Sequence, residues 1–323
     1  MIKTAIMTVG ELLVEFVSHQ KGCALRKVAD YSGPYPSGAP AIFIDQAARM
    51  GADTQIIGAI GADNFGNALV DRLQIDGVDT RGIVRHTDKT TGVAFVSYFD
   101  DGSRTFIFHL SNTAADAVSE TDFLFPDNPL LLHVSGSSLG NPSLRTTIEK
   151  CVDEVLDRGG KISCDPNARA ELMHDSQVRG ALDGIMGKSV YLFPSTSDLE
   201  FLFPGKSEQE VMNTLHAQGA DIVALKRGAD GSTISTADGR INFPGHSVQE
   251  IDPTGAGDCF CGTFLAMIAR GHSPEVAGVY ANAAGALAVT KRGPMEGNSS
   301  PAMIEHFLES PESRLHSESP EHV

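Results

Sequence analysis

Hydrophobic positions along this chain recur with two spacings, one typical of strands and one typical of helices. Residues 4–9 form a short apolar run that predicts a buried strand, and residues 41–50 repeat apolar side chains at helical spacing up to Gly51, a favourable C-cap residue. From residue 130 the two spacings alternate. The elements expected there are strands at 130–135, 161–165, 190–193 and 222–226, and helices at 143–157, after 165, at 197–203 and at 208–216. This alternation predicts a parallel sheet with helices on both faces, whose active site lies at the C-terminal ends of the strands.

The N-terminal third predicts further strands. The alternation of residues 10–16 is expected to continue the first strand, with Glu11, Leu13 and Glu15 on one side. Residues 33–40 are rich in Gly and Pro and are expected to form a loop. Residues 91–110 predict a hairpin with its turn at 100–102. Because isolated hairpins are only marginally stable, it is expected to pack on other strands.

The composition indicates a globular enzyme with one main domain at 1–308 and a polar C-terminal tail at 309–323. The chain has 323 residues, of which 41% are hydrophobic and 20% charged, which is enough for a large α/β core with a small appendage. A net charge of −16 argues against nucleic acid or an anionic membrane as a partner. Residues 1–10 do not resemble a signal peptide, so a cytoplasmic location is expected. The five cysteines are expected to be small core residues.

The stretch from Asp252 to Asp258 carries the most specific chemistry. An Asp-Pro pair predicts a turn, and Gly255 and Gly257 allow the backbone to approach a ligand closely. The apolar segment that follows predicts a helix, whose first N–H groups suit an anion. Asp258 in the first turn could simply complement the helix dipole. Alternatively, it accepts the proton of a hydroxyl that attacks a phosphorus.

This stretch, DPTGAGD, resembles the C-terminal signature of the ribokinase-like carbohydrate kinases, with Pro253 in place of the usual Thr. The resemblance implies that Asp258 is the catalytic base. It also implies that the backbone of Gly255, Ala256 and Gly257 forms an anion hole for the transferred phosphoryl group. The implied fold is a ribokinase-like three-layer α/β sandwich with a small β-sheet lid. The implied activity is the ATP-dependent phosphorylation of a primary sugar hydroxyl.

The same resemblance implies sugar-binding residues. Glu15 matches an acidic residue that holds sugar hydroxyls, although a plain edge-strand position is the alternative. Gly38 matches a glycine of the N-terminal signature at which the backbone approaches the sugar. Residues 165–169 resemble the family's Asp-x-Asn-x-Arg, which implies that Asn167 and Arg169 reach toward sugar and phosphate.

Two further motifs imply nucleotide and magnesium contacts. Ser195 and Asp198 stand where the family has Asn-x-x-Glu, so Asp198 is expected to contact Mg²⁺ through water. Lys226, Gly228 and Gly231 match the nucleotide loop, for which a simple surface turn is the alternative.

The segment that follows the central motif predicts a helix at 274–289. By resemblance, Asn282 of this helix lies beside the adenine of ATP. The residues implied to enclose an activating K⁺ ion are Asp252, Thr254, Ala288, Lys291 and Gly293.

Segments 12–32 and 91–110 match the family's lid, which covers the sugar, excludes water and often forms a homodimer interface. His109 on the returning lid strand could meet a sugar hydroxyl or be an ordinary surface residue. In 2-keto-3-deoxygluconate kinases an Arg binds the substrate carboxylate from a position that is Leu110 here, which favours a neutral sugar.

Residues 36–46 resemble the corresponding run of tagatose kinases. D-tagatose is therefore the first candidate substrate, followed by fructose. A nucleoside kinase and a catalytically silent sugar-binding protein are the alternatives that remain.

Overall fold

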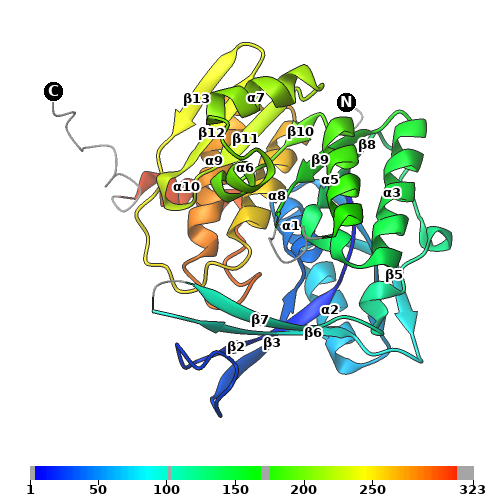
Figure 1. The fold of residues 1–323 in the computed structure, drawn as a ribbon. Helices are drawn as coiled ribbons and strands as arrows, with labels where there is room; N and C mark the ends of the chain where they lie inside the picture. The colour runs from blue at the N-terminus through cyan, green and yellow to red at the C-terminus, as the bar shows by residue number, and fades with distance from the viewer. Residues whose placement is uncertain (1–3, 101–102, 169–174, 311–323) are drawn as a thin grey trace.

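The computed structural model describes residues 4–100, 103–168 and 175–310. In these ranges nine strands form one central sheet (Figure 1). The spatial order of its strands is β13 (Gly239–Phe243), β12 (Ser232–Thr236), β11 (Ile222–Lys226), β10 (Tyr191–Leu192), β9 (Lys161–Asp165), β8 (Leu130–Ser135), β1 (Ala5–Val9), β4 (Asp53–Gly61) and β5 (Asp79–His86). Neighbours from β11 to β5 are parallel, whereas β12 and β13 extend the sheet in antiparallel fashion.

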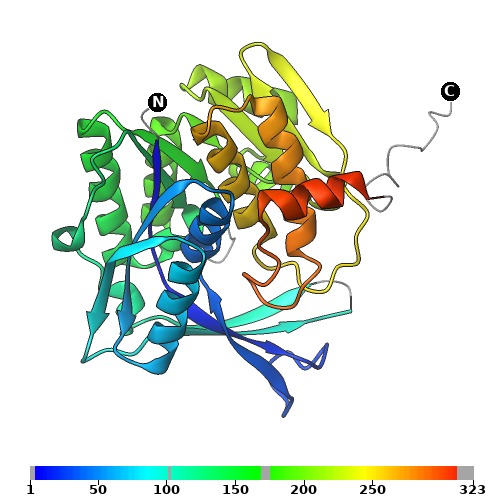
Figure 2. The ribbon, with the colours of Figure 1, turned by 180° about the vertical axis from the view of Figure 1, so that it is seen from behind.

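Helices cover both faces of this sheet, so the expected three-layer α/β sandwich is confirmed. The helices that pack in one hydrophobic core are α1 (Ala39–Arg49), α2 (Asn64–Ile75), α8 (Ala256–Ala269), α9 (Pro274–Ala288) and α10 (Pro301–Glu309). The helices that pack in the core of the other face are α3 (Pro142–Asp157), α5 (Ser176–Lys188), α6 (Thr196–Leu202) and α7 (Glu208–Ala217). Figure 2 shows α9 and α10, in orange and red, on the face turned toward the viewer.

A second sheet forms the lid, with the strand order β3 (Tyr31–Ser37), β2 (Leu13–Ser18), β6 (Gly92–Tyr98) and β7 (Arg104–His109). The expected β6–β7 hairpin is confirmed, and it pairs with β2 in parallel fashion. The loop expected at 33–40 is wrong for residues 33–37, which belong to β3. Two prolines are tolerated there because β3 lies at the edge of the sheet and needs few backbone donors.

The continuous first strand expected from residue 4 to residue 16 is also wrong. β1 ends at Val9 in the central sheet, and β2 begins at Leu13 in the lid. Glu11 lies in the connection and is not a strand neighbour of Glu15. The chain therefore enters the lid at the C-terminal end of β1, so the lid lies at the sheet edge where the active site is expected (Figure 1).

Two expectations from composition can be compared with the described residues. All five cysteines are buried and form no disulfide, as expected for core residues. No helix in the described ranges combines the length and the apolar character that a membrane span requires. Most of the expected polar tail, residues 311–323, lies outside the described residues.

Candidate active site

The N-terminus of α8 forms the turn that the central motif predicts. Gly255 is the N-cap residue, in the left-handed conformation with φ 85°. A Cβ at this position would lie 2.4 Å from the carbonyl oxygen of Pro294, so only glycine fits. Asp258 lies in the first turn of the helix and is half-buried. The backbone N–H groups of this turn and one carboxylate are therefore neighbours at the sheet edge, as an anion hole with an adjacent base requires.

An ion pair lies directly beside this turn. Lys226 at the end of β11 pairs with Asp165 at the end of β9, and Asp165 is only 2% exposed. A Cβ placed on Gly257 would lie 3.3 Å from the Nζ of Lys226, so the ammonium group adjoins the turn. Burial alone would lower the pKa of Lys226, but the carboxylate of Asp165 outweighs burial and raises it. The lysine is therefore positively charged where an anion would bind.

The end of β9 also positions the residues that follow Asp165. The N–H of Asn167 donates to Asp165 Oδ1 at 3.1 Å, and its side-chain amide donates to the hydroxyl of Ser135 at 3.4 Å. Asn167 has φ 39°, a backbone conformation that Asn tolerates better than most residues. It therefore lies at the same sheet edge as Lys226. Arg169, the other residue expected from this motif, lies outside the described residues.

Ser195 and Asp198 form a capping box at the N-terminus of α6. Asp198 Oδ2 accepts hydrogen bonds from the N–H of Ser195 at 2.7 Å and from its hydroxyl at 2.6 Å. Oδ1 accepts a bond from the N–H of Ala168 at 2.7 Å, and Asp198 is 3% exposed. Both oxygens thus have protein partners, which documents a structural role for Asp198. Its contact with Mg²⁺ through water stays a prediction.

The expected nucleotide loop and Asn282 come together around residues 243–245. Gly228 and Gly231 have φ 57° and 94°, and a Cβ on Gly231 would lie 2.0 Å from the carbonyl oxygen of Phe243. The side-chain amide of Asn282 donates to the carbonyl of Pro244 at 2.7 Å. The two glycines and Asn282 therefore border one surface that runs from the end of β11 to α9.

The residues expected around K⁺ centre on Asp252, which is 1% exposed. Its Oδ1 accepts bonds from the N–H of Thr254 at 3.0 Å and from the hydroxyl of Tyr98, and its Oδ2 accepts one from the N–H of Gly293 at 2.9 Å. No basic side chain in the described ranges forms an ion pair with Asp252. A buried carboxylate that has only neutral donors suits a cation, so these residues fit a monovalent ion.

The other expected K⁺ residues lie on the segment that runs beside this carboxylate. The carbonyl of Val289 accepts bonds from the N–H groups of Ile251 and Asp252, at 2.8 Å and 3.2 Å. Ala288 is buried, whereas the side chain of Lys291 is exposed. Lys291 could therefore contribute its backbone carbonyl and not its ammonium group.

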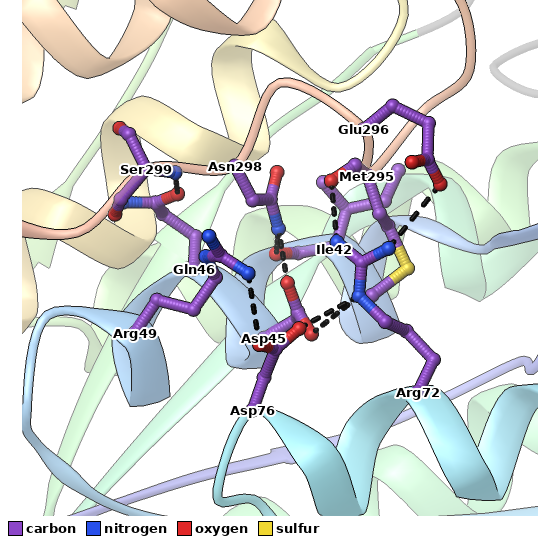
Figure 3. Close-up of polar contacts among 10 residues, drawn as sticks. All are labelled: Ile42, Asp45, Gln46, Arg49, Arg72, Asp76, Met295, Glu296, Asn298 and Ser299. Carbon is purple, nitrogen blue, oxygen red and sulfur yellow. Dashed lines mark hydrogen bonds and ion pairs between the residues drawn. The ribbon is translucent and has the colours of Figure 1, made fainter. Parts of the chain in front are cut away.

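A buried polar network holds the chain that follows Gly293 (Figure 3). Asp45 of α1 is fully buried and accepts a bond from the amide of Asn298 at 2.5 Å. Arg72 of α2 lies 3.6 Å from Asp45, pairs with Asp76 at 2.7 Å and donates to the carbonyl of Met295 at 2.7 Å. Burial raises the pKa of Asp45 to about 8 against the attraction of Arg72. Of the two carboxyl groups beside Arg72, that of Asp45 is therefore protonated and that of Asp76 keeps its negative charge.

The network continues from α1 to α8. The side-chain amide nitrogen of Gln46 donates to the hydroxyl of Thr263 and to the carbonyl of Ser299, both at 2.9 Å. The thiol of Cys259 donates to Asn298 Oδ1 at 2.8 Å. Hydrogen bonds from Gln46 thus join α1 both to the middle of α8 and to the segment that ends at Ser299.

On the sugar side, the structure brings Glu15 and the N-terminal signature together. Glu15 is 2% exposed and accepts a bond from the hydroxyl of Ser37 at 3.3 Å. Gly38 has φ 108°, and a Cβ there would lie 2.5 Å from the carbonyl oxygen of Glu11. These residues form one buried polar patch where the lid meets the central sheet.

His109 does not join this patch. In the lid, Glu15 pairs with Ala94, whereas His109 pairs with Val93. Adjacent strand residues point to opposite faces, so His109 lies on the other face from Glu15. It is exposed, and its ring meets the edge of Phe95 at 6.2 Å. A contact of His109 with a sugar hydroxyl stays a prediction.

Two tyrosines were not anticipated from the sequence. Tyr98 is the last residue of β6 and shares the lid face of Ala94 and Glu15. Tyr35 of β3 pairs with Glu15 and lies on the same face. The alternation of apolar residues in β6 could have placed Tyr98 on this face, but its partner Asp252 is distant in sequence.

The fold and the site combine features that phosphoryl transfer requires: an α/β sheet, backbone N–H groups at a helix N-terminus, a carboxylate in the same turn and a lid. Comparison with known proteins agrees. The chain belongs to the pfkB family of carbohydrate kinases, whose family model matches residues 3–301. The expected class, an ATP-dependent carbohydrate kinase with a ribokinase-like fold, is thereby confirmed.

The relatives include sugar kinases of known structure. A candidate ribokinase II of E. coli, solved without ligand, has a TM-score of 0.90 and 38% identity, over 94% of this chain and 99% of that chain. The fructokinase of Vibrio cholerae O395, solved as a double mutant with fructose, ADP and potassium, has a TM-score of 0.83 and 25% identity, over 95% and 99%. Fructokinase-1 of Oryza sativa subsp. japonica is 30% identical, over 89% of this chain and 92% of the rice protein.

Proposed function

We propose that this kinase transfers a phosphoryl group from MgATP to a primary hydroxyl of a neutral ketohexose, with D-tagatose first and fructose second. One observation carries the proposal: the turn from Gly255 to Asp258 adjoins the ammonium group of Lys226 and lies beneath a lid that contains Glu15. Acceptor carboxylate, anion hole and sugar-binding patch therefore meet at one sheet edge.

The residues of the turn divide the chemistry between them. MgATP supplies the γ-phosphoryl group. Asp258 accepts the proton of the attacking hydroxyl, and the N–H groups of Gly255, Ala256 and Gly257 hold the phosphoryl oxygens. Lys226 adds a fixed positive charge beside Gly257, and a fixed charge needs no reorganisation during the reaction.

The lid supports a neutral sugar. Leu110 occupies the position at which a carboxylate-binding Arg would be expected for a sugar acid. Arg104 lies on the lid face of Tyr98, but its guanidinium stacks over Phe106 at 5.2 Å. Relatives named fructokinases support a ketohexose as the acceptor.

The bound ions form part of the same proposal. The E. coli candidate ribokinase II has also been solved in complex with ATP and Mg²⁺, and the Vibrio fructokinase with potassium. In this chain, the fit of Asp252 to a cation supports K⁺ near Thr254, Ala288 and Gly293. The K⁺ ion would stabilise the loop that precedes the anion hole.

The proposal also includes a cytoplasmic homodimer joined through the lid. Tyr31, Ile107 and Phe108 of the lid are large apolar side chains that are 37%, 43% and 43% exposed. Light scattering of the purified protein tests this assembly, and a monomer at micromolar concentration would contradict it.

A screen for ADP release tests the substrate. D-tagatose, fructose, ribose, nucleosides and 2-keto-3-deoxygluconate are compared at equal concentration, and Asp258→Asn serves as the control. We expect the highest kcat/KM with a ketohexose, and no turnover in Asp258→Asn although the sugar still binds. A higher kcat/KM for 2-keto-3-deoxygluconate would contradict the argument from Leu110.

A catalytically silent sugar-binding protein is the second candidate function, because Ser195 and Asp198 are engaged in a helix cap. Sugar binding without turnover in the unmodified protein would favour it.

A further inference from the structure

The lid contacts the loop before α8 through one buried hydroxyl. Tyr98 ends β6, is 9% exposed and donates a hydrogen bond to Asp252 Oδ1. Its hydroxyl also lies 2.7 Å from the hydroxyl of Thr254. Figures 1 and 2 both show the end of β6 and the start of β7 on the side of the loop that leads into α8. Tyr98 thus joins the lid sheet to the loop between β13 and α8.

A second lid tyrosine contacts the loop of Gly293, which lies next to Asp252. The ring of Tyr35 packs against Gly293, where a Cβ would lie 2.7 Å from the ring carbon Cδ1. Gly293 in turn donates its N–H to Asp252 Oδ2. Tyr35 and Tyr98 also share a small hydrophobic cluster with Val17. The face of the lid that carries Glu15 therefore holds Asp252 from two sides.

Both partners of the Tyr98 hydroxyl lie directly before the N-terminus of α8. Asp252 and Thr254 immediately precede the turn of Gly255, whose N–H groups begin the anion hole. A shift of the lid that moves Tyr98 therefore moves an anchor of that turn.

We propose that Tyr98 is a positioning residue through which the lid, when it closes on the sugar, fixes the loop of Asp252 and Thr254 and hence the anion hole. This inference rests on the proposed function for the anion hole and for the identity of the sugar. Because linkage is reciprocal, a ligand at the loop must also favour the closed lid.

The test compares Tyr98→Phe with Tyr280→Phe. Both variants lose one hydroxyl that donates to a carboxylate, and Tyr280 of α9 donates to Glu305 of α10 at 3.0 Å. Hydrogen exchange of the ligand-free full chain is followed by mass spectrometry. We expect exchange in the segment 250–256 to become faster by about tenfold or more in Tyr98→Phe and to stay unchanged in Tyr280→Phe. The ring of Tyr98 remains in the variant, so an unchanged circular dichroism spectrum checks the fold.

Steady-state rates give a second readout with whichever sugar the enzyme phosphorylates. We expect kcat to fall about tenfold or more in Tyr98→Phe at saturating sugar, with Tyr280→Phe unaffected. We also expect D-tagatose to slow exchange of the segment 250–256 in the unmodified protein and not in Tyr98→Phe.

The two proposals can fail separately. Equal exchange of the segment 250–256 in unmodified protein and Tyr98→Phe overturns the positioning role, whatever the sugar. If Tyr98→Phe accelerates exchange but D-tagatose has no effect on the unmodified protein, the positioning role stands and the choice of sugar is wrong.

Discussion

Replacement of Lys226 by Met removes the ammonium group beside the anion hole and leaves Asp165 buried without its cation. Removal of one partner of a buried ion pair costs about 3–5 kcal/mol, and the lower value applies because the Lys226 side chain is 14% exposed. An unfolding entropy of about 2.1 cal/mol/K per residue gives about 0.7 kcal/mol/K for 323 residues. We therefore expect Tm to fall by about 4–5 °C.

The double variant Lys226→Met with Asp165→Asn separates stability from catalysis. Neutral residues of similar volume leave no buried charge unpaired, so we expect the free energy of unfolding to return to within about 1 kcal/mol of the unmodified protein. The positive charge at the phosphoryl site stays absent. We therefore expect kcat to remain about 10²–10³-fold low in both variants.

Calorimetry and an ADP-release assay at saturating MgATP and sugar check these expectations. Asp165→Asn alone completes the cycle and measures the coupling energy of the pair. A kcat within threefold of the unmodified enzyme in Lys226→Met would refute the assignment of Lys226 to the phosphoryl group. A double variant that is no more stable than Lys226→Met would refute the account of the buried pair.

Four further perturbations test other parts of the structure. Because the pKa of Asp45 is raised in the folded state, the stability that it contributes should be lost as the pH rises from 4 toward 8, and the free energy of unfolding measured in urea should depend less on pH in Asp45→Asn. In Gly255→Ala a Cβ meets Pro294 at positive φ, so thermal unfolding should reveal a loss of about 1–2 kcal/mol. Glu15→Gln should raise KM for the sugar about tenfold, and an unchanged KM would contradict a contact between Glu15 and the sugar. Replacement of K⁺ by tetramethylammonium should lower kcat about tenfold. Equal values of kcat with the two cations would contradict the proposed K⁺ site.

Much of the central sheet could be predicted from the sequence because its strands are buried and sharply bounded. The strands expected at 130–135, 161–165 and 222–226 have those bounds in the structure. The break after Val9 could not be predicted, because apolar residues continue through two strands of different sheets. The strands β5, β12 and β13 were not expected, since the exposed residues of β5 and β13 weaken the apolar alternation.

In the site, local geometry could be predicted from the sequence, whereas contacts between distant segments could not. The turn from Gly255 to Asp258 is contiguous in sequence, so its geometry could be predicted. Tyr98 contacts Asp252 across 154 positions, and no local pattern specifies such a pair. The strand face of His109 could not be predicted either, because it depends on the pairing with Val93. An Asp at position 45 inside an apolar helix was a usable signal, since a buried carboxyl requires partners.

The altered Asn-x-x-Glu motif is consistent with catalysis once the strand ends are considered together. Ser195 and Asp198 cap the N-terminus of α6. The backbone of Ser195 forms an isolated parallel β-bridge with that of Lys226. The N–H of Lys226 also donates to the carbonyl of Pro194 at 2.8 Å. The capping box therefore stabilises the backbone from which the ammonium group reaches Gly257. With these residues the site retains a fixed cation beside the turn that we propose as the anion hole, and a fixed charge in a partly dry site stabilises a phosphoryl group more than a mobile one.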